Sequence, residues 1–335
     1  MTQAAQVPLL SIAIPTYNRA NVLTLCLDTI LAQADPFGEE IEVLISNNAS
    51  TDQTAAIIQD YVKHYPRLKQ RSNPENLGLD YNIRTCFQVA SGKYVWVFSD
   101  DDMLLPNALN RLMPLLRSRD FGLITMTPSF YTHSINTDLF DCDSFAWDEY
   151  INPHAYIQQK HLHLTYISIT IINKQALDAT RIVDLGIGCF LIQLGWVIPA
   201  IFGRLPCADI SACLMLGRSL VVMDYKHFAV FGTSYKQVLI QLCNAAILPR
   251  ASKELLLDLA ITDYFAPYIR LPSYVPPYGE RPFRILWSTF WTRPTFWRVL
   301  IPLFVNRMAF IVVRRLSQIR FTRLRLLLRR RRGGD

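Results

Sequence analysis

The chain of 335 residues is 51% hydrophobic and 18% charged, with a formal net charge of +7. This is the length and composition of a globular protein with one large domain or two smaller ones, not of a disordered chain. The seven cysteines are scattered singly without a CxxC pair, which excludes a disulfide framework or a cysteine zinc site and indicates a reducing compartment. Because residues 1–7 lack the features of a signal peptide, we expect a cytoplasmic body.

The first third of the chain alternates apolar runs with amphipathic segments. The expected elements are a strand at 9–14, a helix opened by residues 18–21, a strand at 41–45, a helix behind a capping box at 50–53, a helix at 79–89 and a strand at 94–98. This alternation predicts an α/β fold with a doubly wound sheet.

The next part of the chain is less regular. We expect a helix at 108–113 that stops or kinks at Pro114, a strand at 121–127, an irregular insert at 128–160, a strand at 167–172, a helix at 174–179 and mostly helical structure from 234.

Three polar segments follow the predicted strands, at residues 15–19, 46–52 and 99–102. In doubly wound sheets, ligands bind beyond the carboxyl ends of the strands, so these segments are expected to converge at one edge. The convergence predicts a ligand site there.

Residues 99–102 read Ser-Asp-Asp-Asp directly after an apolar run. Adjacent carboxylates are costly to bury unless a cation or water lies beside them. The cluster is either a solvated turn or a site for Mg²⁺ or Mn²⁺, hard cations that pair with phosphate-bearing substrates.

The C-terminal segment 293–335 holds twelve arginines and one acidic residue, so the rest of the chain has a net charge of −4. Its apolar run at 299–313 is interrupted by polar residues and is too short to span a bilayer. Mixed apolar and cationic residues, with aromatic residues at 287–297, favour a helix in the headgroup layer of an anionic membrane. A helix packed on the body and a nucleic-acid contact are the alternatives, and we expect no nucleic acid.

The motifs together resemble glycosyltransferase family 2. Residues 11–19 resemble its opening strand and loop, 45–52 its second loop, 76–78 with Asn82 and 91–94 its middle section, and 99–102 with Pro106 its metal-binding loop. The likeness covers residues 9–120 and is loosely closest to the O-antigen subset of abequosyltransferase-like members.

The resemblance implies a GT-A fold, a Rossmann-like α/β domain, and a nucleotide-sugar donor. The residue pattern adds a helical, basic amphipathic C-terminal region. Together they divide the chain into a nucleotide-sugar half at 1–120, an acceptor half at 121–233 and a helical region at 234–335. The residues that it places around the donor are Pro15, Thr16, Tyr17, Arg19, Asn47, Asn76, Gly78 and Asp100, with Asp101 and Asp102 as ligands of Mn²⁺ or Mg²⁺. Asn47 stands where an Asp is usual, which leaves the nucleobase open, since an amide can both accept and donate hydrogen bonds.

The proton acceptor is harder to locate, because no carboxylate follows the glycines of residues 186–188. Asp184 is the nearest candidate base, and a helix-capping or solvated aspartate is its alternative. Rival carboxylates lie in the predicted insert, at Asp141, Asp143, Asp148 and Glu149.

The function expected from the resemblance is an inverting, metal-dependent transfer of a sugar from a nucleotide-diphosphate donor to a saccharide in surface polysaccharide synthesis. The basic segment 293–332 places the protein peripherally at the cytoplasmic face of a membrane, and we therefore expect the acceptor to be lipid-linked. A catalytically degenerate GT-A scaffold and a nucleotidyltransferase are the alternatives, although the Gly-rich, Lys-bearing loop that a nucleotidyltransferase needs is missing from residues 15–18.

Overall fold

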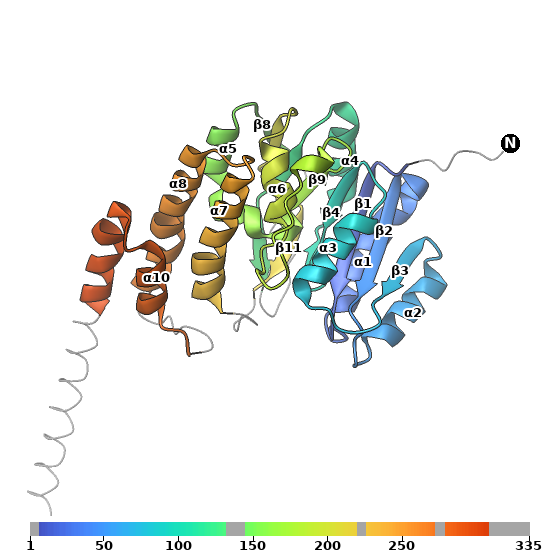
Figure 1. Ribbon diagram of the computed structural model, residues 1–335. Helices are drawn as coiled ribbons and strands as arrows, with labels where there is room; N and C mark the ends of the chain where they lie inside the picture. Colours follow the sequence, from blue (N-terminus) through green and yellow to red (C-terminus); the bar gives the residue numbers. More distant parts are fainter. Residues whose placement is uncertain (1–6, 132–144, 220–225, 272–278, 308–335) are drawn as a thin grey trace, which may run out of the picture. The chain divides into compact units, whose positions relative to one another are not determined.

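The computed structural model describes residues 7–131, 145–219, 226–271 and 279–307 (Figure 1). The chain divides into two compact units, Met1–Asp224 with Ser234–Leu256, and Tyr225–Thr233 with Leu257–Asp335. The first unit contains both sheets and the second is helical. The division into a nucleotide-sugar half (1–120), an acceptor half (121–233) and a helical region (234–335) stays a prediction. The role of the basic segment also stays a prediction, and its residues beyond 307 lie outside the described residues.

The large sheet has eight strands in the order β3-β2-β1-β4-β9-β6-β10-β8. Its first half is parallel: β1 (Leu10–Thr16), β2 (Ile41–Asn47), β3 (Leu68–Ser72) and β4 (Tyr94–Val97). Its second half holds β9 (Thr170–Asn173), antiparallel to β4 and to β6 (Leu123–Met126), then β10 (Cys207–Ile210) and β8 (Trp147–Tyr150).

A second, three-stranded sheet is formed by β5 (Met103–Leu104), β11 (Met215–Arg218) and β7 (Ser129–Tyr131). Because β5 starts immediately after residues 99–102, pairing of β5 with β11 brings residue 218 beside the acidic loop. This pairing could not be expected from the local sequence pattern.

Two helical layers cover the large sheet. Helices α1 (Leu23–Ala34) and α4 (Ala108–Ser118) contribute to one hydrophobic core with Leu10, Ile12 and Ile14 of β1. Helices α3 (Leu79–Val89) and α6 (Leu194–Ile201) lie side by side, with the rings of Phe87 and Trp196 stacked at 4.4 Å (Figure 1). Both faces of the parallel strands are therefore buried, which explains their continuous apolar runs.

The remaining helical elements complete the two units. They are η1 (Asp35–Glu40), α2 (Thr54–His64), α5 (Pro153–Lys160), η3 (His161–Thr165), η4 (Ile167–Ile169), η5 (Ala179–Arg181), η6 (Ala229–Ser234), α7 (Tyr235–Asn244), α8 (Arg250–Leu259), η7 (Ala260–Phe265), α9 (Ala266–Arg270), α10 (Pro282–Phe290) and η9 (Phe296–Leu300). No helix within the described ranges is both long enough and apolar enough to cross a membrane.

Several element boundaries differ from the sequence expectation. Helix α4 continues through Pro114 to Ser118, because Leu115 and Leu116 are buried in the core and hold the last turn in place. The helix expected at 174–179 is wrong: a turn follows β9, where the side chain of Asn173 accepts a hydrogen bond from the backbone N–H of Ala176 at 3.0 Å. The insert expected to be irregular contains β8 and α5.

A buried carboxylate joins three parallel strands near their amino ends. Glu42 accepts hydrogen bonds from the Ser11 hydroxyl, from the Ser91 N–H at 2.8 Å and from Lys69 Nζ at 2.6 Å. Gly92 packs so closely that an added Cβ would lie 2.7 Å from the Ser11 nitrogen. The Ser-Gly-Lys-Tyr segment at 91–94 therefore has a structural role.

We expect Glu42→Gln to lower the free energy of unfolding by about 2–3 kcal/mol, because an amide cannot accept all of these hydrogen bonds. Burial opposes ionisation of Glu42, but the hydrogen bonds from Lys69, Ser11 and Ser91 outweigh it and hold its pKa below the usual value. A carboxyl group whose pKa is lowered by folding stabilises the fold at pH values above its unfolded-state pKa. This stabilisation is lost as the pH falls through the folded-state pKa. Urea unfolding at neutral and acidic pH measures the free energy of unfolding, with Glu39→Gln, at an exposed position, as the control. Equal stability of the two variants at neutral pH would contradict the structural role of Glu42.

Candidate functional site

The carboxyl ends of β1, β2 and β3 lie in register, with Thr16 opposite Asn47 and Asn47 opposite Ser72. Strand β4 is paired with β1 from Leu10–Tyr94 to Ala13–Val97, so the acidic loop leaves the sheet at the same edge. The predicted convergence of polar segments is confirmed by this register.

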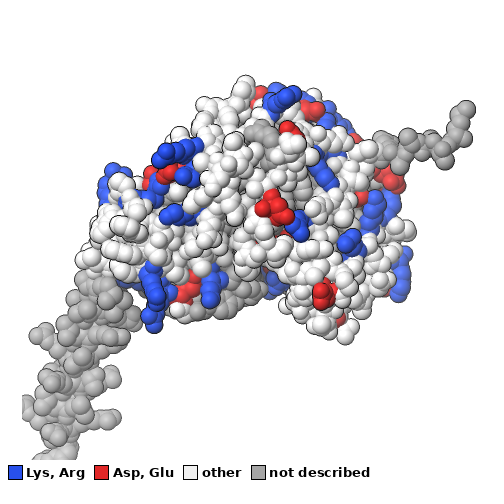
Figure 2. Space-filling model, viewed as in Figure 1, with Lys and Arg blue, Asp and Glu red and all other residues white. Residues whose placement is uncertain are grey.

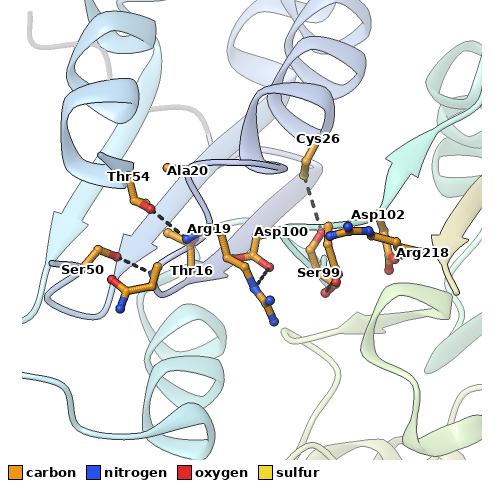
Figure 3. A network of polar contacts seen from close by, with 12 residues as sticks. Thr16, Arg19, Ala20, Cys26, Ser50, Thr54, Ser99, Asp100, Asp102 and Arg218 are labelled. Atoms are coloured by element: carbon orange, nitrogen blue, oxygen red, sulfur yellow. Dashed lines mark hydrogen bonds and ion pairs between the residues drawn. The ribbon is translucent and has the colours of Figure 1, made fainter. Parts of the chain in front are cut away.

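The loop after β1 is bound to the loop after β2 through backbone donors. The N–H groups of Asn18 and Arg19 donate to Ser50 Oγ at 3.0 Å and Thr54 Oγ1 at 2.9 Å (Figure 3). The N–H of Ala20 donates to Asp52 Oδ2 at 3.1 Å. The expected capping box is wrong, because α2 starts at Thr54 and the Ser50 hydroxyl accepts from Asn18 instead. The strand-end loops are thereby held as one rigid rim.

Of the residues predicted to line a donor pocket, those in this rim differ in exposure. Pro15 and Thr16 are buried at the end of β1, whereas Tyr17 is exposed and Arg19 is half-buried. Asn47 is buried, and its Oδ1 accepts a hydrogen bond from the Ser50 N–H at 3.0 Å. Tyr17 and Arg19 therefore present side chains at the surface of the rim, and the other three shape its base.

A cluster of hydrogen-bonded asparagine side chains connects the loops at the same edge of the sheet. Asn48 Nδ2 donates to Asn76 Oδ1 at 2.8 Å, and Asn48 Oδ1 accepts from Asn73 Nδ2 at 2.8 Å. Asn82 Nδ2 donates to the Ser46 carbonyl at 2.9 Å. Asn76 Oδ1 also accepts from the N–H of Gly78, whose φ of +87° favours glycine. Asn76 and Gly78 thus form a turn that is fixed to β2, and Asn48 and Asn73 were not anticipated.

The acidic loop follows β4 and contains two deeply buried carboxylates. Asp100 is 5% exposed, and its Oδ1 lies 3.5 Å from Arg19 Nε. Burial raises the pKa of Asp100 to about 7, and the Thr16 hydroxyl and the Arg19 guanidinium oppose this shift. Arg19 and Asp100, both predicted from the sequence, are therefore brought together as a cation beside a carboxyl group (Figure 3).

Asp102 is the most enclosed residue of the loop, at 2% exposure. Its Oδ2 accepts from the Tyr166 hydroxyl at 2.7 Å and its Oδ1 from the backbone N–H of Arg218 at 3.0 Å. Burial and the neighbouring Asp101 raise the pKa of Asp102 to about 7, against hydrogen bonds from Ser168, Tyr166 and Arg218.

Asp101 is half-buried, and its Oδ1 accepts from the Ser99 hydroxyl at 2.7 Å. The Tyr131 hydroxyl donates to its backbone carbonyl at 3.0 Å. Ser99 itself donates its N–H to Ser168 Oγ at 2.9 Å. Asp101 is consequently the carboxylate of this loop that is best placed to meet a solvent-borne ligand.

Arg218 is a site residue that the sequence motifs do not include. Its side chain extends from the end of β11 toward Ser99 in Figure 3, whereas Arg19 lies beside Asp100, so a guanidinium group is drawn near each of these two loop residues. The only sequence signal is an arginine directly after the apolar run of residues 214–217. Its position depends on the long-range pairing of β5 with β11, which no local pattern encodes.

The carboxyl groups suit a divalent cation that is shared with a ligand. Among the described residues, no group of three or more His, Cys, Asp and Glu side chains is arranged to hold a metal by itself. Mg²⁺ is typically held by one or two carboxylates together with phosphate oxygens and water. Asp101 and Asp102 supply such a pair of hard oxygen ligands, so the residues fit the predicted metal role.

The predicted base, Asp184, is placed in a different setting. Its side chain is 64% exposed, with Oδ2 2.7 Å from Arg84 Nη1 and Oδ1 accepting from the Gly186 N–H at 3.1 Å. Gln193, where α6 starts, donates through Nε2 to the Thr165 carbonyl at 2.5 Å and is an amide without basicity. The base role of Asp184 stays a prediction.

Two of the other carboxylates considered for the base role lie in the described part of the chain, and neither has a contact with the acidic loop there. Glu149 lies on the edge strand β8, where its Oε1 accepts from Arg119 Nη2 at 3.1 Å. Asp148 is its neighbour on that strand, and Asp141 and Asp143 lie outside the described residues.

A cavity of about 730 Å³ lies between α1 and α2 and not at the acidic loop; it is lined by Thr24, Asp28, Gln53, Ala56, Ile57, Asp60, Tyr61, His64 and Tyr65. We place the candidate site at the acidic loop nevertheless, because paired carboxylates and flanking cations meet there and the cavity contains neither arrangement.

Residues 11–169 match the model of the family described as glycosyl transferase family 2. Abequosyltransferase RfbV of Salmonella typhimurium is 39% identical over 112 residues, which cover 33% of each protein. The GalNAc(5)-diNAcBac-PP-undecaprenol beta-1,3-glucosyltransferase of Campylobacter jejuni is 34% identical over 107 residues, 32% of this chain and 34% of that protein. The aligned part thus spans about a third of the length of these curated relatives.

Two solved structures share the fold. S. aureus TarS 1-349 in complex with UDP-GlcNAc has a TM-score of 0.57 and 17% identity, covering 77% of this chain and 72% of that one. Mannosyltransferase PcManGT from Pyrobaculum calidifontis, in complex with GDP-Man and Mn²⁺, has a TM-score of 0.50 and 17% identity, covering 90% and 88%.

The layered sheet and the acidic loop at its carboxyl edge define a GT-A domain, as predicted. Residues 11–169, a little under half of the chain, are similar to glycosyl transferase family 2.

Proposed function

We propose that the protein transfers a sugar, with inversion, from a nucleoside diphosphate sugar to a saccharide acceptor. The observation that carries the proposal is the acidic loop with two buried carboxyl groups, Asp100 and Asp102, flanked by Arg19 and Arg218. A site of alternating cations and carboxylates can hold a diphosphate together with a divalent cation.

The residues have separate parts in this proposal. Tyr17 and Arg19, on the rim, contact the nucleoside. Asp101 and Asp102 hold Mn²⁺ or Mg²⁺, which when bound neutralises charge on the diphosphate as a Lewis acid. The Arg218 guanidinium adds a second positive charge where the leaving diphosphate becomes more anionic, and Tyr166 holds the Asp102 carboxylate in place.

We further propose a lipid-linked saccharide as the acceptor, at the cytoplasmic face of a membrane that the protein binds peripherally through its basic segment 293–332. The twelve arginines of residues 293–335 support an anionic partner. The Campylobacter jejuni relative, whose name includes PP-undecaprenol, supports a lipid-linked acceptor, and RfbV, an abequosyltransferase by name, supports sugar transfer.

The proposal is tested by thermal unfolding with UDP, GDP, CDP and dTDP, each with and without Mn²⁺. We expect one nucleotide to raise the melting temperature, with a larger rise when Mn²⁺ is present, since ligands that bind only the native state stabilise it. Consumption of the matching nucleotide sugar in the presence of an acceptor extract then tests transfer. A folded protein that responds to none of the four nucleotides would favour a non-catalytic scaffold.

The raised pKa values predict that Mn²⁺ binds more tightly as the pH rises. With pKa values of about 7, Asp100 and Asp102 are largely protonated at pH 6 in the metal-free protein. A metal ligand must lose its proton, so Mn²⁺ affinity should rise by about tenfold or more from pH 6 to pH 8. A carboxyl pKa raised by folding also makes the metal-free protein less stable as the pH rises from about 4 to about 7. Calorimetric titration in buffers of different ionisation enthalpy measures the proton release, and affinity independent of pH would contradict the expectation.

The base role of Asp184 has its own test. If this carboxylate takes the acceptor proton, Asp184→Asn lowers kcat by about 10²–10⁴-fold. Arg84→Gln removes the ion pair but keeps the carboxylate, so we expect a much smaller loss. Small and equal losses in both variants would show that Asp184 has only a structural role, through its contacts with Arg84 and Gly186.

A further inference from the structure

The helical unit carries a cluster of exposed aromatic side chains on residues 282–305. Helix α10 and the segment through η9 have one side packed inward, where Leu286, Phe290, Phe296 and Leu300 are fully buried. The sequence had grouped Phe290 and Phe296 with the interfacial tryptophans, and their burial separates them from that set. The exposed set is Phe283, Trp287, Trp291, Trp297 and Val305, which we call the tryptophan face.

Contacts among its members make the tryptophan face one continuous surface. The ring of Trp287 lies 5.6 Å from that of Phe283 and 5.2 Å from that of Trp297. Trp297 Nε1 donates to the Trp291 carbonyl at 2.6 Å, which fixes the two segments to each other. Phe283, Trp287 and Trp291 are spaced four residues apart, so they share one side of the helix. Trp291 and Trp297 are 53% and 47% exposed, an unusual exposure for such large apolar side chains.

The charged residues within the segment that carries this face are all basic. Residues 281–307 contain five arginines and no acidic residue, and Arg281, Arg284 and Arg298 are exposed beside the aromatic side chains. Figure 2 shows the helical unit as largely uncharged surface with more blue than red atoms. Tryptophan prefers the bilayer interface, and exposed arginines attract anionic headgroups.

We propose that the tryptophan face is a membrane-docking surface whose aromatic rings enter the interfacial layer of an anionic bilayer. This occupant fits better than a second copy of the chain, because two such faces would bring the exposed Arg281, Arg284 and Arg298 of each copy together, six like charges. The proposal does not depend on sugar transfer, since binding to vesicles is measured without donor or acceptor. It also differs from attachment through arginines alone, which would be purely electrostatic and lost at high salt.

The test uses the full chain with phosphatidylcholine vesicles, with and without added phosphatidylglycerol, at physiological and high salt. We expect the Trp287→Ser/Trp297→Ser variant to bind anionic vesicles at least about tenfold more weakly than the parent. Ile151→Ser, which removes an apolar side chain 83% exposed on the other unit, should bind as the parent does. Binding by the double variant equal to that of the parent would overturn the proposal.

A second measurement needs no substitution and therefore does not depend on how a variant folds. Three of the six tryptophans lie on this face, whereas Trp96 and Trp196 are buried in the other unit. Vesicles with brominated acyl chains should quench and blue-shift the fluorescence of the bound parent protein. Vesicle binding without quenching, or a dimer in solution that the double variant abolishes while vesicle binding is unchanged, would overturn the proposal.

Discussion

Asp102→Asn should abolish measurable sugar transfer, with a loss in kcat of at least about 100-fold. Asp102 is proposed to hold the metal beside the diphosphate, and an amide is a weaker ligand without charge. Mn²⁺ should also lose its stabilising effect on the nucleotide complex. The measurement is initial rate over a range of Mn²⁺ concentrations, together with melting temperature.

A control variant distinguishes metal binding by Asp102 from a purely structural role of Asp102 in the acidic loop. Tyr166→Phe removes the hydrogen bond to Asp102 Oδ2 but keeps both carboxylate oxygens. We expect this variant to need more Mn²⁺ while it recovers most of its rate when Mn²⁺ is saturating. If Asp102→Asn loses no more activity than Tyr166→Phe at saturating Mn²⁺, the carboxylate acts only as part of the scaffold.

Arg218→Ala should lower kcat by about 10²–10³-fold, since a fixed cation beside a developing anion is worth that much. The substitution leaves the backbone intact, so the N–H of residue 218 still donates to Asp102 Oδ1. A loss of activity therefore reports the guanidinium and not the loop contact. Arg218→Lys keeps a charge but not the planar fork, and an intermediate rate is expected.

The matched control for this prediction is Arg204→Ala. Arg204 is exposed and precedes β10, at the amino end of the parallel strands and so at the edge away from the acidic loop. Its loss should leave kcat and the KM for the donor unchanged. Equal rates in Arg218→Ala and the parent would show that Arg218 has no part in transfer.

Local sequence patterns predicted the part of the fold that rests on continuous apolar runs. Helix α3 has the bounds expected at 79–89, and strands β1, β2 and β4 of the parallel half agree with the expected ranges to within a few residues. Strand β3 was missed because Leu68 is its one buried residue, which leaves no alternation to detect. The turn at 174–177 was misread, since a side-chain contact by Asn173 outweighed the helical propensity of the next residues.

In the candidate site, too, local sequence patterns predict some residues, and tertiary contacts alone determine others. Arg19 and Asp100 could be proposed together because each lies in a polar segment at a strand end. Tyr166 and Arg218 could not, because they reach the loop from 64 and 116 residues further along the chain, through pairings that form only in the folded protein. Which residue takes the acceptor proton is likewise set by tertiary placement, and the glycine loop carries no motif that identifies it.

The most direct measurement is an anomalous difference map from crystals grown with Mn²⁺ and the nucleoside diphosphate that stabilises the protein most. The account predicts a peak within about 2.0–2.6 Å of a carboxylate oxygen of Asp101 or Asp102, with the diphosphate as a further ligand and the Arg218 guanidinium beside it. A nucleotide bound elsewhere, or one whose diphosphate lies away from residues 99–102, would contradict the assignment of the acidic loop as the donor site.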